Sequence, residues 1–482
     1  MNDLTPALAQ HGTRLTGLKC VMLSGGVRGN LDEPGRYWGL IRLPGAYILR
    51  EELEKYGIEV EIIDYIQHFT DEQLYDLYDF IEDYEPDFIT ISDTFLEFDV
   101  VDGISKTIKM LKDIPIIAGG MNPHTHMYDA VDYKIYNYGE NALIEVLEHH
   151  FCQKEVMFEM RGNTKFINAT HTYKTWPKED YAYRFRKEDL INEYDIGTLE
   201  FSRGCRFRCK FCNWPILGVK EDTSQKDIDS IVSMLNYNYE NFGISFYIMA
   251  DDTFNDRTEK LEKLAVIAET VNFDVRFSAF MRLDLVWSYP EQLDLMIRSK
   301  LTAPHFGVET FNEKAAKIIG KGKQAVIAKD MLIKLDKAFE EAGLDYHPSC
   351  SMIAGLPEET PEECIASQEW YREHYKKHVI WFPLDIHNDG ENLSAFGEDM
   401  RKWGMELIDN KAFHNNMTKH LPATNWKNKH WTAASAARLA HKLNDMNLSK
   451  TISWYQGFAN LPPNTKQHIP QRYIKQRLQD LR

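Results

Sequence analysis

Gly197-Thr-Leu-Glu-Phe201-Ser-Arg-Gly-Cys205-Arg-Phe-Arg-Cys209-Lys-Phe-Cys212 joins a predicted strand, Gly197–Phe201, to a loop that holds three cysteines. The cysteines follow the pattern C-x3-C-x2-C, and no fourth Cys or His lies nearby in the sequence. Thiolates are soft ligands, and clustered thiolates hold zinc or iron–sulfur centres. Three protein ligands leave one metal position open, as catalysis requires, whereas structural sites are usually closed. The pattern therefore favours a catalytic iron–sulfur centre at this loop.

This spacing, with the aromatic Phe211 just before the third cysteine, resembles the signature of the radical S-adenosylmethionine (radical SAM) enzymes. The resemblance implies that Cys205, Cys209 and Cys212 bind a 4Fe-4S cluster. In that family the iron without a protein ligand chelates the amino and carboxylate groups of SAM, and the aromatic residue lies beside its adenine. The alternatives are a zinc knuckle or three incidental cysteines.

The composition of the 482-residue chain is typical of a cytoplasmic enzyme with two or three domains. The other four of its 7 cysteines, Cys20, Cys152, Cys350 and Cys364, show no disulfide pattern. Met1–Gly17 lacks the features of a signal peptide, and no stretch approaches the ~18 apolar residues of a membrane span. The formal net charge of −17 argues against broad binding to nucleic acid.

Residues 1–153 alternate between predicted strands and helices, which indicates a doubly wound parallel sheet of the Rossmann type. The expected strands are Lys19–Leu23, Glu59–Ile63, Phe88–Ile91, Ile114–Ala118 and Tyr133–Tyr136. The expected helices run from Pro44 to Gly57 and over Asp71–Tyr84, Val100–Lys112 and Asn141–His149. Ligands of such sheets bind beyond the carboxyl ends of the strands.

The loops at those ends resemble the cobalamin-binding domain that precedes the radical domain in one branch of the superfamily. Ser92 and Gly119-Gly120 occupy the places that border the corrin and its nucleotide tail in that domain. The first loop lacks the Asp-x-His-x-x-Gly motif whose histidine ligates cobalt, and we interpret His124 and His126 as ordinary loop residues. The resemblance of the loops still implies that this domain binds cobalamin. The alternative is that the bulky side chains of Tyr37 and Trp38 exclude it.

A charged segment, residues 154–193, is predicted to be a linker, and residues 194–385 resume the strand–helix alternation. The expected strands are Gly197–Phe201, Ile244–Met249, Val275–Phe280, Ala303–Val308, Asp345–Ile353 and Val379–Pro383. The expected helices are Ser224–Tyr239, Arg257–Val271, Gln324–Ala342 and Pro361–His374. Six such units fit a partial (β/α)6 barrel with its active site at the carboxyl ends of the strands.

Three later strand ends resemble, in order and spacing, the D-D-x-F, G-V-E-[ST] and G-L-P-x-E-T segments of cobalamin-branch radical enzymes. They begin at Asp251, Gly307 and Gly355. The resemblance implies that Asp251 binds the methionine amino group of SAM, that Glu309 makes polar contacts to SAM, and that Gly355 lets backbone approach the adenine. Asp252 could instead cap the next helix, and Glu309 could pair with Arg282.

Two further features are interpreted as structural. Lys321-Gly322-Lys323 is expected to be a solvated turn. Residues 386–482 are expected to be mostly helical and rich in aromatic side chains, with a helix at Ala433–Leu443 and a solvated helix in the tail Arg472–Arg482. Most of the aromatic residues in this region and in the strand just before it should be core: Trp381, Trp403, Trp426, Trp431, Trp454, Tyr455 and Phe458.

The resemblance implies cleavage of SAM to a 5′-deoxyadenosyl radical, with cobalamin-dependent methyl transfer to an unactivated carbon as the leading outcome. The first alternative is a radical rearrangement, cyclisation or oxidation without functional cobalamin. The second is a non-catalytic iron–sulfur or zinc protein. The expected partners are an electron donor such as flavodoxin or ferredoxin and a small-molecule, peptide or nucleotide substrate, whose identity the sequence does not reveal. The sequence also singles out no catalytic residue.

Overall fold

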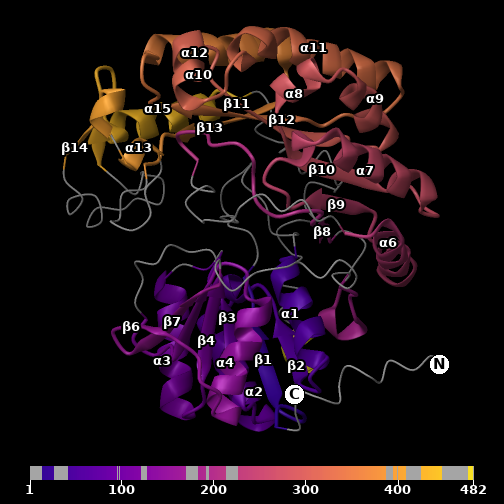
Figure 1. Cartoon of the computed structure of the whole chain (residues 1–482), viewed down its shortest axis with the longest axis vertical. Coiled ribbons are helices and arrows are strands. Elements are labelled where there is room, and N and C mark those ends of the chain that lie inside the picture. Colours follow the sequence, from indigo (N-terminus) through magenta and orange to yellow (C-terminus); the bar gives the residue numbers. More distant parts are fainter. Residues whose placement is uncertain are drawn as a thin grey trace.

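The computed structural model describes residues 14–25, 42–94, 96, 98–120, 128–169, 183–191, 195–212, 226–386, 395–398, 400–408, 425–447 and 476–480. Two parallel sheets organise it, one in the N-terminal part and one in the following part of the chain (Figure 1). The predicted α/β fold class is confirmed. None of the described helices is long and apolar enough to cross a membrane.

The N-terminal sheet has the strand order β2-β1-β3-β4-β5-β7-β6. Its strands are β1 (Lys19–Leu23), β2 (Glu59–Ile63), β3 (Phe88–Ser92), β4 (Ile116–Gly120), β5 (Tyr133–Tyr136), β6 (Glu159–Arg161) and β7 (Thr164–Asn168). All neighbours are parallel except β6 and β7. The order reverses between β1 and β3, and such a switch point opens a crevice at the carboxyl edge.

The helices of this unit are α1 (Pro44–Glu54), α2 (Asp71–Tyr84), α3 (Phe98–Leu111) and α4 (Glu140–Cys152), with the short η1 (Ile66–His68). Central strands such as β3 are buried on both faces, which explains why they are continuous apolar runs rather than alternating ones. The prediction of a plain linker after residue 153 is wrong for β6 and β7, because β7 pairs with β5 and extends the sheet.

The second sheet contains six parallel strands in sequence order, from β8 to β13. They are β8 (Gly197–Leu199), β9 (Phe246–Met249), β10 (Arg276–Met281), β11 (Ala303–Glu309), β12 (Ser349–Ala354) and β13 (His378–Pro383). Among the described strands β8 and β13 are edges, which makes this an open, partial barrel. Its carboxyl edge is therefore where an active site is expected.

The connecting helices cover the outer face of this sheet (Figure 1). They are α6 (Ile228–Phe242), α7 (Thr258–Thr270), α8 (Leu283–Ser288), α9 (Glu291–Arg298), α10 (Glu313–Ile319), α11 (Gln324–Glu341) and α12 (Pro361–Trp370), which continues as the π-helix η5 (Tyr371–Tyr375). Short 3-10 turns occur at η2 (Lys187–Asp189) and η4 (Phe254–Asp256). The sequence did not predict α8, α9 and α10, which are 6, 8 and 7 residues long.

The described C-terminal residues form α13 (Ala395–Glu398), η6 (Met400–Trp403), β14 (Glu406–Leu407), β15 (Trp426–Lys427) and α15 (Ala433–Asp445). Trp381, Trp426 and Trp431 are buried, and each indole N–H donates to a protein oxygen. The prediction that these tryptophans are core is confirmed, because a buried indole needs such a partner. Trp454, Tyr455 and Phe458 lie outside the described residues.

The short helical segment 476–480 contacts the N-terminal sheet. Arg477 is buried and donates hydrogen bonds to Glu61 and to the carbonyl of Ile62 at 3.2 Å. Leu478 packs against Tyr65. The prediction of a solvated tail is therefore wrong at these two residues.

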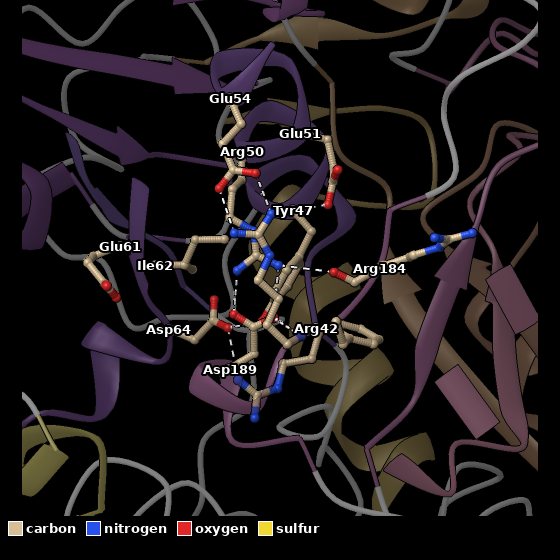
Figure 2. A network of polar contacts seen from close by, with 12 residues as sticks. Arg42, Tyr47, Arg50, Glu51, Glu54, Glu61, Ile62, Asp64, Arg184 and Asp189 are labelled. Atoms are coloured by element: carbon tan, nitrogen blue, oxygen red, sulfur yellow. Dashed lines mark hydrogen bonds and ion pairs between the residues drawn. The ribbon is translucent and has the colours of Figure 1, made fainter. Parts of the chain in front are cut away.

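Buried ion pairs join α1 to the segment that leads into the second sheet (Figure 2). Arg42 binds Asp64, at the end of β2, at 2.8 Å and Asp195, just before β8, at 3.1 Å. Arg50 binds Asp189 at 2.6 Å. Buried charges are stable only when they are paired and hydrogen-bonded, so these contacts fix the approach to β8 on α1 and β2.

Candidate functional site

The cysteine loop leaves the carboxyl end of β8, as expected, and its three cysteines form no disulfide and are half-buried. Cys205 Sγ lies 3.5 Å from Thr253 Oγ1, and the guanidinium of Arg282 donates to Cys209 Sγ at 3.4 Å. Burial raises the pKa of Cys205, partly opposed by the Thr253 hydrogen bond. The Arg282 cation, just after β10, is therefore well placed to stabilise a thiolate.

An iron–sulfur cluster and a single zinc ion require different arrangements of their ligands. Among the residues that the structure describes, no three Cys, His, Asp or Glu side chains converge on one metal position. A zinc ion needs all of its ligands at about 2.0–2.3 Å. In an iron–sulfur cluster each thiolate binds a different iron, and hydrogen bonds to the sulfurs tune the potential. The three thiols lie on one loop, and Arg282 donates a hydrogen bond to one of them.

Asp251 holds the base of this loop in place. One carboxylate oxygen accepts the backbone N–H of Phe201 at 2.8 Å, and the other accepts the N–H and the hydroxyl of Ser202, both at 2.9 Å. Lys260 pairs with it at 3.1 Å, and the side chain is buried. Both oxygens are engaged inside the protein, which gives Asp251 a positioning role, and its expected contact with SAM stays a prediction.

A buried charge cluster, made of Arg203, Glu140, Glu200 and Lys226, ties the same loop to the N-terminal sheet. Arg203 donates to both oxygens of Glu140, at 3.2 and 2.5 Å, and to Glu200 at 2.9 Å. Burial lowers the pKa of Lys226 to about 8. Glu140 begins α4 after the rim of β5, so the cluster joins two carboxyl edges. Sequence reasoning missed it, although Ser-Arg-Gly lies directly before Cys205.

Glu309 ends β11 at a β-bulge, in the left-handed conformation with φ of +71°. A non-glycine residue in this region stores strain and is typical of functional sites. Its buried carboxylate lies 3.4 Å from Lys321 Nζ and 3.4 Å from Ser351 Oγ, and burial raises its pKa. Glu309 thus pairs with Lys321, and Arg282 pairs with Asp284 at 2.8 Å instead.

Lys321 corrects a second expectation, because it is buried rather than solvated. Its ammonium donates to the carbonyl of Gly307 at 2.9 Å and lies 5.9 Å from the centre of the Phe211 ring. It therefore connects the end of β11 with the cysteine loop.

Gly355 follows β12 with φ of +106°, which disfavours any side chain. A Cβ there would lie 2.6 Å from the Trp426 ring and 3.1 Å from Ala436. The carbonyl accepts a hydrogen bond from Asn428 at 3.1 Å. Glycine is required by packing against β15 and α15, and the expected approach of adenine to this backbone stays a prediction.

Ser92 and Gly119 are partners in register at the carboxyl ends of β3 and β4, so the structure brings together two of the predicted cobalamin residues. Gly120 has φ of +149°, and a Cβ there would lie 2.4 Å from the Asp93 carboxylate. Asp93 is held by Lys134 and by the Tyr128 hydroxyl. Tyr37, Trp38, His124 and His126 lie outside the described residues.

Comparison with known proteins agrees with this geometry. Residues 199–370, from β8 to the end of α12, match the radical SAM superfamily. This part of the chain is a radical SAM domain. An uncharacterized methyltransferase of Synechocystis is 33% identical over 136 residues, which is 27% of this chain and 25% of the relative. Another from Pyrococcus horikoshii is 23% identical over 249 residues, 51% of this chain and 50% of the relative.

The hopanoid C-2 methylase of Rhodopseudomonas palustris is 24% identical over 176 residues, 36% of this chain and 32% of the relative. The chain thus spans a quarter to a half of these curated relatives. Among solved structures, the radical SAM methyltransferase TsrM from Kitasatospora setae, with tryptophan and a SAM analogue bound, has a TM-score of 0.62 at 15% identity over 84% of this chain and 80% of that one.

The cobalamin-dependent radical SAM enzyme OxsB, with aqua-cobalamin bound, has a TM-score of 0.54 at 17% identity over 80% of this chain and 56% of that one. At these identities the likeness establishes a shared fold. The likeness covers at least 80% of this chain, so it extends over both sheets.

Proposed function

We propose that this chain is a cobalamin-dependent radical SAM methyltransferase acting on an unactivated carbon. The observation that carries the proposal is the loop of three half-buried cysteines at the carboxyl end of β8, the first strand of an open parallel barrel. The methyltransferase names of the relatives, and the cobalamin bound by OxsB and TsrM, support the finer assignment.

In this proposal Cys205, Cys209 and Cys212 hold a 4Fe-4S cluster, and Phe211 lies beside the adenine of SAM. When bound, cluster and SAM supply a 5′-deoxyadenosyl radical, and cobalamin supplies the methyl group. Arg282 balances the thiolate charge, and Asp251 fixes the loop through Ser202.

In this proposal Glu309 and Lys321 form a polar part of the SAM site beside the cysteine loop. The raised pKa of the buried Glu309 carboxyl makes its hydrogen-bonding state sensitive to a bound cation such as the SAM ammonium. At the other edge, Ser92, Gly119 and Gly120 border the corrin. Gly119 leaves space beside the strand ends, because a Cβ there would meet only the Ile135 carbonyl, at 3.9 Å.

The first test is the cluster. Anaerobically reconstituted protein should bind about one four-iron cluster and release 5′-deoxyadenosine from SAM with a flavodoxin- or ferredoxin-type donor. Changing Cys205, Cys209 and Cys212 to Ala should abolish both, whereas Cys152→Ala, a half-buried cysteine outside the loop, should leave both unchanged. Release of 5′-deoxyadenosine by the triple variant would refute the assignment.

The second test is cobalamin. Protein incubated with hydroxocobalamin should show the bound cofactor in its absorption spectrum, and Gly119→Phe should prevent binding while leaving the cluster intact. Normal SAM cleavage without bound cobalamin would favour the alternative of a radical rearrangement, cyclisation or oxidation.

The third test is the SAM contact. Glu309→Gln keeps the shape and removes the charge, so SAM binding should weaken by about 1–3 kcal/mol in equilibrium dialysis. Glu341→Gln, an exposed carboxylate on α11, is the control. Unchanged affinity would reduce Glu309 to a structural partner of Lys321.

A further inference from the structure

One row of side chains crosses the inner face of the second sheet. Phe280, His305, Ser349 and His378 are partners in register on β10, β11, β12 and β13, and we call them the inner row. The rings of Phe280 and His305 meet edge to face with centroids 5.2 Å apart. His305 Nδ1 lies 2.6 Å from Ser349 Oγ.

The two faces of this sheet differ in what covers them. Residues that alternate with the inner row, such as Phe306 and Cys350, are fully buried beneath the outer helices. On the inner face Phe280 is 42% exposed, and Phe382, which shares the face of His378, is 49% exposed. In Figure 1 this face looks toward the N-terminal sheet. Large exposed aromatic rings on a concave face are typical of ligand sites.

The inner row carries no charge. Burial lowers the pKa of His305 to about 3 and that of His378 to about 4, so both imidazoles are neutral at physiological pH. The charged groups further along this face have protein partners: Glu309 pairs with Lys321, Glu200 with Arg203 and Arg276 with Asp274. Glu309 lies four residues beyond His305 on β11, or ~13 Å along the strand.

The bond to Ser349 fixes the orientation of the His305 ring. Among the described residues no protein group bonds the other ring nitrogen, Nε2, and the ring edge borders the exposed face of Phe280. A neutral imidazole offers one donor and one acceptor, so Nε2 can bond a hydroxyl, a carbonyl or an N–H.

We propose that the inner row binds an uncharged, flat and largely apolar part of the substrate, packed on Phe280 and hydrogen-bonded to His305 Nε2. The substrate then extends from this wall toward the cysteine loop. The proposal rests on the proposed function and adds the chemical class of the substrate. A carboxylate or phosphate at this depth would be desolvated, and Lys321, the cation whose charge acts on His305, is already paired with Glu309, so its burial would be costly.

The test uses the cluster-reconstituted full chain with two probes, indole and indole-3-acetate, which share a ring and differ by a carboxylate. Saturation-transfer NMR titrations should show indole binding, and indole-3-acetate binding at least about tenfold more weakly. Phe280→Lys, at an exposed position that tolerates a long side chain, should invert this preference. Tyr289→Ala, an exposed aromatic residue beyond α8, is the control and should change neither affinity.

Two results would overturn the proposal: equal affinity for the probes in the wild type, or a preference that Phe280→Lys leaves unchanged. Displacement of indole by adenosine would identify the wall as an adenine site and would also overturn it. Release of 5′-deoxyadenosine is measured in the same samples. Its absence refutes the proposed function, whereas the probe affinities test the wall separately.

Discussion

Arg203 is the residue whose removal should disturb the cysteine loop most, because it neutralises two buried carboxylates at once. Its guanidinium makes contacts of 3.2 and 2.5 Å to Glu140 and of 2.9 and 3.4 Å to Glu200. In Arg203→Met the volume is largely kept, and only Lys226 remains as a nearby cation. Removing one partner of a buried pair costs about 3–5 kcal/mol.

The effect should be local, so hydrogen exchange is the assay. The amides of Phe201 and Ser202 are protected by Asp251, and they should exchange faster by on the order of a hundredfold or more in Arg203→Met, as opening of the segment becomes easier. Arg206→Met is the matched control, since Arg206 is exposed and donates only to the carbonyl of Asp256. Iron content should fall in the first variant alone.

The sign of the pH dependence follows from the carboxylates. Burial alone would raise the pKa of Glu140, and Arg203 outweighs it, so the pKa is lowered in the wild type. Without Arg203, burial is opposed only by the smaller effects of a backbone hydrogen bond and Lys226, so we expect the folded-state pKa to rise above 4.5 and the folded variant to bind a proton more tightly than the unfolded chain. The loss of stability in Arg203→Met, relative to the wild type, should therefore shrink as pH falls from about 7 toward about 5.

A double-mutant cycle with Glu140→Gln completes the test. The two changes should be non-additive by roughly 1–3 kcal/mol, because each removes the same interaction. Additive effects, or an Arg203→Met protection pattern identical to that of Arg206→Met, would refute the reasoning.

Three further outcomes are expected. Asp251→Asn should destabilise the loop by about 3–5 kcal/mol and lower iron content, whereas Asp274→Asn, in an exposed pair, should cost less than about 1 kcal/mol in the same denaturation assay. Gly355→Ala should lower the melting temperature, because the φ of +106° and the clash with Trp426 together cost about 1–3 kcal/mol. Adding Trp426→Phe should not restore the part of this loss that comes from the strained φ. His305 stays neutral when folded, with a pKa of about 3 against 6.5 when unfolded, so its contribution to stability is complete above pH 6.5 and is lost as pH falls toward 3; His305→Gln should flatten the fall in the free energy of unfolding over that range, by about 1.4 kcal/mol per pH unit.

The sequence by itself determined the strands and the chemistry of the cysteine loop. Glu59–Ile63, Tyr133–Tyr136 and Asp71–Tyr84 have the predicted bounds, because apolar runs and helical spacing act over a few neighbouring residues. The C-x3-C-x2-C spacing is equally local. The alternation of strands and helices made parallel sheets the simplest arrangement. The N-terminal sheet and the second sheet are both parallel, apart from the β6–β7 pair.

Only the tertiary structure decided what the individual rim residues do. Asp251 faces the backbone of Ser202, Lys321 turns inward to Glu309, and Gly355 lies under Trp426 from a distant segment. Each of these roles depends on which group fills the adjacent space. That group comes from a segment that is distant in the sequence and is brought there by folding. The sequence does not distinguish a charged residue or glycine that faces a ligand from one that faces a backbone amide or a tryptophan ring. The partner of such a residue is set by tertiary packing and not by its neighbours in the sequence.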